Sequence, residues 1–71
     1  MNILIFKTNI RFKKDLKTVA RIMNTIPAVN VWNVDREDVD KVLRIETSLN
    51  DHGVFINTMT RAGYACEVLT D

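Results

Sequence analysis

The chain of 71 residues has one cysteine, one proline and two glycines. A single cysteine cannot form an internal disulfide, so the fold does not depend on an oxidising compartment. No apolar run approaches the length of about 20 residues that a membrane span requires. Residues 1–6 run directly into a strand pattern and lack the layout of a cleavable signal. We therefore expect a cytoplasmic protein with no membrane partner.

Signatures of catalysis are missing as well. The two glycines, Gly53 and Gly63, are too few and too far apart to form a glycine-rich phosphate cradle. No nucleophile stands at a recognisable spacing from the one histidine, His52, and no paired acid/base pattern occurs. We expect a protein that is not an enzyme and carries no cofactor.

What is present is an alternation of strand and helix patterns. β-branched and aromatic residues without breakers predict four strands, at residues 2–8, 29–34, 41–47 and 64–69. Helical periodicity fills the first and third intervals, and the polar segment 35–38 fits a turn within the second. This order predicts an α+β ferredoxin-like βαββαβ sandwich: residues 1–71 form a single domain in which a four-stranded antiparallel sheet carries two helices on one face.

Each predicted helix has an apolar stripe and an end signal. Over residues 12–26 the stripe consists of Phe12, Leu16, Val19, Met23 and Ile26. Pro27 ends that helix, because the residue before a proline avoids helical angles. The second helix begins at a cap on Asn50 or Asp51 and ends at Gly63. Its expected apolar face consists of Phe55, Ile56, Met59 and Ala62.

The segment Arg61-Ala62-Gly63-Tyr64 resembles the helix end of the heavy-metal-associated domain, the family of small copper chaperones. Weaker support comes from the strand–loop–helix lengths and from the apolar spacing of Val29, Trp32 and Val34. The resemblance spans nearly the whole chain. It implies the ferredoxin-like fold and, in metal-carrying members, a metal loop between the first strand and the first helix.

That loop lacks the metal ligands of the family, whose hallmark is Gly-Met-Thr-Cys-x-x-Cys. Alignment by the resemblance puts Asn9 at the Gly position, Ile10 at the Met position, and Phe12 and Asp15 at the two Cys positions. The family's paired thiolates bind a soft ion such as Cu(I). Phenylalanine has no lone pair, one carboxylate is a hard ligand, and Lys13 and Lys14 repel cations. We expect no metal at this loop.

Cys66 and His52 are the remaining soft or borderline ligands. Cys66 is expected to point inward with Tyr64 and Val68, where a free cysteine acts as a small hydrophobe. His52 is expected to be an ordinary polar surface residue. The alternative is metal handling by unconventional ligands, in a dimer that brings two copies of either side chain together.

Two surfaces are candidates for partner binding. The first is the sheet face turned away from the helices, here called the open face, where strand alternation exposes Ile3, Ile5, Val31, Val42 and Leu69. These apolar side chains are a candidate patch for a homodimer or another protein. The second, here called the basic surface, consists of Arg11, Lys13, Lys14, Lys17 and Arg21.

The basic surface reflects an uneven charge distribution. Up to Val34 the chain has six basic residues and one acid, whereas from Asp35 onward it has four basic residues and eight acids. In metal-carrying members of the resembled family, this end of the fold meets the partner protein and uses charge to orient it. Weak nucleic-acid binding is the competing reading, but no aromatic side chain is expected to be exposed beside the lysines to stack a base.

The sequence thus favours an interaction domain that makes contact with a protein partner or with itself, without metal cargo. Metal handling through Cys66 or His52 and weak nucleic-acid binding through the first helix stay open as alternatives.

Overall fold

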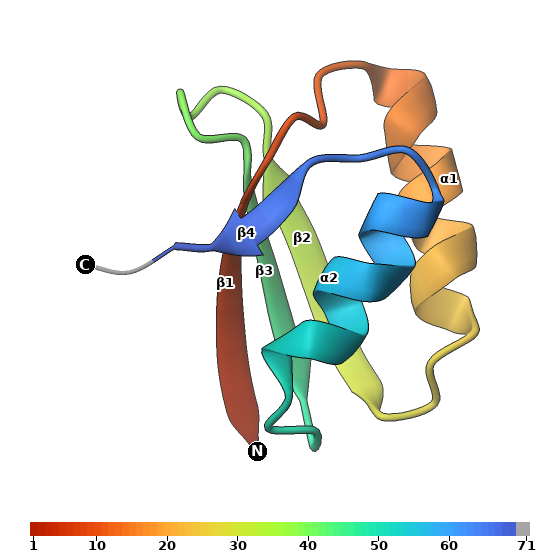
Figure 1. Cartoon of the computed structure of the whole chain (residues 1–71). Coiled ribbons are helices and arrows are strands. Elements are labelled where there is room, and N and C mark those ends of the chain that lie inside the picture. The colour runs from red at the N-terminus through yellow and green to blue at the C-terminus, as the bar shows by residue number, and fades with distance from the viewer. Residues whose placement is uncertain (70–71) are drawn as a thin grey trace.

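The structure, a computed structural model that describes residues 1–69, has the predicted ferredoxin-like architecture. Four antiparallel strands form one sheet in the order β2-β3-β1-β4. Figure 1 shows both helices on the same side of this sheet. The elements are β1 (Asn2–Thr8), α1 (Lys13–Asn24), β2 (Val29–Asp35), β3 (Val42–Thr47), α2 (His52–Arg61) and β4 (Cys66–Val68).

The core lies between the sheet and the two helices. Its buried apolar side chains come from every element except the edge strands β2 and β4, and one comes from a loop. These are Leu4, Phe6, Ile10, Val19, Met23, Leu43, Ile45, Phe55 and Met59. The expected alternation along β1 is confirmed, since Leu4 and Phe6 are buried and Ile3 is half exposed.

The helix ends agree with the sequence signals for α2 and differ for α1. The Asp51 side chain accepts a hydrogen bond from the Gly53 N–H at 2.9 Å, which confirms the predicted cap. Gly63 has a φ of +94°, as expected of the residue after a helix. Helix α1 is shorter than the predicted span 12–26, because Phe12 is extended and Thr25 is the C-cap.

Two strand predictions are also corrected. The third strand begins at Val42 because Lys41 has a φ of +46°, outside the strand region. The last strand is only Cys66–Val68, because the Tyr64 N–H donates to the Met59 carbonyl and closes the end of α2 instead. Val68 pairs with Phe6 and therefore lies on the helix side of the sheet, as expected, but it is 41% exposed because β4 is an edge strand.

The predicted turn at residues 35–38 is confirmed. The Asp35 carboxylate accepts hydrogen bonds from the backbone N–H groups of Glu37 and Asp38, as in other Asx-type turns. No helix among the described residues is long and apolar enough to cross a membrane.

Candidate functional site

The loop between β1 and α1 is fixed from three directions. The Thr8 hydroxyl accepts a hydrogen bond from the Ile10 N–H at 3.2 Å and donates to the Lys41 carbonyl. The Asn9 side chain accepts from the Ala65 N–H at 3.0 Å. Ile10 itself is fully buried in the core. The backbone of this loop is therefore held in place before any ligand or partner is present.

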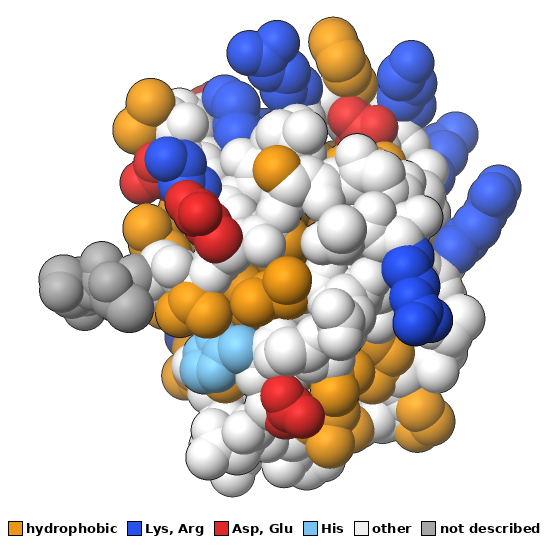
Figure 2. All heavy atoms as spheres, viewed as in Figure 1, with side chains coloured by type: hydrophobic (Ala, Val, Ile, Leu, Met, Phe, Trp, Pro, Cys, Tyr) orange, Lys and Arg blue, Asp and Glu red, His pale blue; other side chains and the backbone are white. Residues whose placement is uncertain are grey.

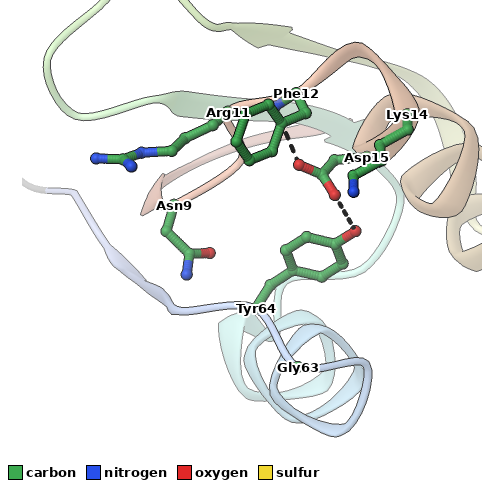
Figure 3. A pocket seen from close by; sticks show the side chains of 7 residues that line it. All are labelled: Asn9, Arg11, Phe12, Lys14, Asp15, Gly63 and Tyr64. Carbon is green, nitrogen blue, oxygen red and sulfur yellow. Dashed lines mark hydrogen bonds between the residues drawn. The ribbon is translucent and has the colours of Figure 1, made fainter.

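Asp15 joins this loop to the end of α2. One carboxylate oxygen accepts a hydrogen bond from the Phe12 N–H at 3.0 Å, which is the return half of a capping box. The other accepts from the Tyr64 hydroxyl at 3.0 Å. Figure 3 shows Asp15 between Phe12 and Tyr64, and Arg11 extending away from the loop. Both oxygens of this carboxylate are therefore engaged within the protein.

These contacts shift the acidity of both partners. The pKa of Asp15 is lowered, mainly because the Phe12 N–H stabilises the carboxylate; burial opposes this shift, and the Tyr64 hydroxyl and Lys14 support it. The pKa of Tyr64 is raised, chiefly by burial and further by its bond to Asp15. At neutral pH the pair therefore consists of a carboxylate and a neutral phenol that donates to it.

Phe12 is the main correction to the sequence analysis. Its side chain was expected in the buried stripe of α1, but it is 58% exposed. Ile10, two residues earlier, occupies the core in its place because the loop turns inward at that residue. The expectation that no aromatic side chain is exposed beside the lysines is therefore wrong: the Lys14 ammonium lies 5.5 Å from the centre of the Phe12 ring.

An open hollow of about 560 Å³ lies beside this ring. The side chains that line it come from the loop, the first turn of α1 and the end of α2. They are Asn9, Arg11, Phe12, Lys14, Asp15 and Tyr64, together with Gly63. The hollow therefore offers two aromatic rings and two cationic side chains, and its one carboxylate is already hydrogen-bonded.

The basic surface begins at this loop and follows α1 to its last turn, where Arg21 lies. Arg11, Lys13, Lys14, Lys17 and Arg21 are all exposed. In Figure 2 the Lys and Arg side chains gather along the upper and right-hand rim, on the side where Figure 1 draws α1. Because the exposed Phe12 lies beside Lys14, the basic surface combines positive charge with one large apolar side chain.

Cys66 and His52 do not resemble metal ligands in this fold. Cys66 is half-buried, and burial raises the pKa of its thiol to about 11, so the thiol is protonated at neutral pH. The His52 ring packs edge-on against Phe6, with 5.6 Å between ring centres. Within residues 1–69, no three His, Cys, Asp or Glu side chains lie close enough together to hold a metal ion.

The open face is less apolar than expected. Ile3 and Ile5 lie next to each other on the open face of β1. Leu69 lies beside Ile5, because its backbone N–H donates to the Ile5 carbonyl at 3.0 Å. Val31 is separated from Ile3 by Glu46, since both residues pair with Glu46 in register. Val42 pairs with Asp35. Charged side chains of β3 therefore divide the five predicted residues.

Neither Ile10 nor Tyr64 was predicted from the sequence as part of the site. A signal for Tyr64 existed, because it directly follows the glycine that ends α2 and was part of the family resemblance. No family model, no curated protein and no solved structure matches this chain. Its relation to the heavy-metal-associated family therefore stays a hypothesis that rests on the sequence resemblance.

Proposed function

We propose that this protein is a non-enzymatic interaction domain whose basic surface binds an acidic region of a partner protein. The observation that carries the proposal is the exposed ring of Phe12, which lies beside Lys14 at one end of a surface with five exposed basic side chains. Aromatic residues and arginine are enriched in protein interfaces, where a buried ring supplies apolar area and the charges orient the partner. Asp15 is the one acid up to Val34, against six basic residues, so this part of the chain keeps a net positive charge, and both oxygens of the Asp15 carboxylate are already hydrogen-bonded.

The proposal includes docking without metal cargo. At the two positions where the resembled family has its cysteines, this chain has an exposed phenylalanine and a carboxylate with both oxygens engaged. In metal-carrying members of the resembled family this loop holds the metal ion, whereas here it presents the Phe12 ring. The family's use of this end of the fold for partner contact is compatible with such a domain.

Single-stranded nucleic acid is the second candidate, and the exposure of Phe12 is the specific observation in its favour. A base can stack on an exposed ring while lysines neutralise neighbouring phosphates. Two observations place it second. The Lys14 ammonium already lies over the ring, and the net charge of the whole chain is only +1, so attraction of a polyanion is confined to one end.

Two matched peptides test the first candidate. Both have the same number of glutamates, but one alternates them with glycine and the other with leucine. We expect the leucine peptide to bind more tightly, because leucine can pack against Phe12. Replacement of Phe12 by alanine should remove that difference, and the triple variant Lys13→Glu, Lys14→Glu, Lys17→Glu should remove binding of both peptides. NMR titration of the amides measures affinity and locates the contact.

Two oligonucleotides of equal charge test the second. One is oligo(dT) and the other is an abasic strand of the same length. A domain that binds acidic proteins should not distinguish the two strands, since only the phosphates attract it. Binding of oligo(dT) about tenfold more tightly than the abasic strand, with loss of the preference in Phe12→Ala, would establish nucleic acid as the ligand.

In the peptide experiment, equal affinities of the wild type for the leucine and glycine peptides would exclude Phe12 as an anchor.

A further inference from the structure

The open face has a charge pattern that is complementary to itself. Strand pairing sets two neighbouring rows across the three strands β2, β3 and β1. The first row is Val31, Glu46 and Ile3, and the second is Asn33, Arg44 and Ile5. Each row thus has one charge at its centre, on β3, and the two central charges have opposite sign.

Within residues 1–69, neither central charge forms an ion pair. The one ion pair among the described residues joins Lys7 to Asp40, with 3.8 Å between the nitrogen and the oxygen, and it involves neither Arg44 nor Glu46. Both helices cover the other side of the sheet, and in Figure 1 no helix or strand lies over the open face. Arg44 is exposed and Glu46 is partly exposed, so both are accessible to a second molecule.

We propose that two copies of this chain pair through their open faces. A two-fold axis that runs across the strands, between the two rows, places the first row of one copy over the second row of the other. Glu46 then faces Arg44 of the second copy, and the reciprocal pair forms by symmetry. The same operation sets Ile3 against Ile5 of the second copy.

The geometry of packed sheets favours this arrangement. Face-to-face sheets keep their strands within about 30° of alignment, so residues near the axis are displaced least by the twist. The charges lie on β3, one of the two central strands, and the isoleucines lie on β1, the other. An axis parallel to the strands would set Arg44 against Arg44 if it ran over β3, or against Ile5 if it ran between β3 and β1, and neither arrangement pairs opposite charges.

The size of the face predicts a weak dimer. Four strands at about 4.8 Å spacing and six residues at about 3.3 Å give a footprint of about 400 Å² on each copy. That is the smallest class of specific interface, so association should appear only as the concentration rises. The dimer would leave both basic surfaces free, and it does not depend on the function proposed for them.

Sedimentation equilibrium over rising concentration tests the proposal with three variants. Arg44→Glu sets two carboxylates against each other at both pairs, and Glu46→Arg sets two guanidinium groups against each other. We expect either single variant to stay monomeric at concentrations where the wild type dimerises. The double variant Arg44→Glu, Glu46→Arg restores opposite charges across the interface and should dimerise to within a few-fold of the wild type.

Mixing the two single variants gives the sharpest result. An Arg44→Glu chain and a Glu46→Arg chain carry opposite charges at both contacts, so the mixture should form a heterodimer that neither variant forms alone. Lys17→Glu, which changes net charge by the same amount on the basic surface, should dimerise like the wild type. A monomeric wild type at every concentration, or a mixture that stays monomeric while both variants are folded by circular dichroism, would overturn the proposal.

Discussion

The basic surface and the open face are both exposed, but their charges are arranged in opposite ways. The basic surface carries five cations and one aromatic ring beside a single carboxylate, that of Asp15. The open face alternates sign along its central strand, with Arg44 and Glu46 two residues apart. A surface of one sign repels its own copy, whereas an alternating surface can match it. The two regions therefore suit different kinds of partner.

The two regions also differ in what holds them in place. The open face is fixed by the ladder of backbone hydrogen bonds between neighbouring strands. In the basic surface, Arg11 and the neighbouring Phe12 ring lie on a loop that is anchored by the burial of Ile10 and by the hydrogen bonds of Thr8 and Asp15. Changes to these anchors should disturb the basic surface first.

The largest expected effect is a difference in the free energy of unfolding between a variant of the buried Ile10 and a variant of the exposed Phe12. Ile10→Ala should lower the free energy of unfolding by about 2–5 kcal/mol, because it leaves a cavity in a fully buried position. Phe12→Ala should change it by less than about 0.5 kcal/mol, because the ring is largely exposed. Urea unfolding of both variants measures the difference. Similar losses for the two would mean that Phe12, and not the loop alone, packs in the core.

A reciprocal pair of charge reversals tests whether the two surfaces act independently. Lys17→Glu and Arg44→Glu change the net charge equally, but on opposite sides of the molecule. We expect Lys17→Glu to weaken acidic-peptide binding several-fold and leave dimerisation intact, with the reverse outcome for Arg44→Glu. NMR titration and sedimentation of both variants give the four measurements. If each variant impaired both activities, one continuous surface would be responsible.

Gly63→Ala should lower the stability of the fold but change the local structure only beside the basic surface. An added Cβ at this position meets no atom within 4 Å, so the cost comes from the backbone, where a φ of +94° disfavours side chains. We expect the free energy of unfolding to fall by about 1–2 kcal/mol and the amide chemical shifts of Tyr64 and Asp15 to change. Gly63→Asn, which tolerates this region better, should cost less. Shifts along β3 instead would contradict the separation of the two surfaces.

The smallest effect is the response to acid. Because the pKa of Asp15 is lower in the folded protein than its ordinary value of 3.8, its ionised form stabilises the fold above that pH. This contribution is lost as the pH falls through the lowered folded value. Asp15→Asn has no carboxyl group to protonate at this position. As the pH falls below about 4, the variant should therefore lose less stability than the wild type. Thermal unfolding from pH 7 downward measures both; parallel curves would contradict the assignment.

The order of elements and their main boundaries could be predicted from the sequence. Gly63 and Asp51 mark the ends of α2 because their local chemistry alone decides the backbone there. The alternation in β1 was predictable because a strand repeats every two residues. The fold class follows from these local signals and from the number of strands and helices. The positions of the basic side chains followed in the same way from the helical repeat.

The candidate site was only partly predictable. Helical spacing counted Phe12 as a core residue, but the loop turns inward at Ile10 and leaves the ring outside. The bond between Tyr64 and Asp15 joins residues that are 49 positions apart, and no local pattern encodes it. The expectation for Ala62 was wrong for a related reason: it is the C-cap of α2 and is exposed, because the chain leaves the helix there.

By itself the sequence determined the order of strands and helices, the ends of α2 and the basic character of α1, because each depends on neighbours within a few residues. Only the tertiary structure decided which side chain of the loop enters the core and which charges share the open face. Both depend on the pairing of distant segments: Ile10 is buried by packing against other elements, and Glu46 divides Val31 from Ile3 through strand register. Register is set by long-range contacts, and these form only when the chain has folded.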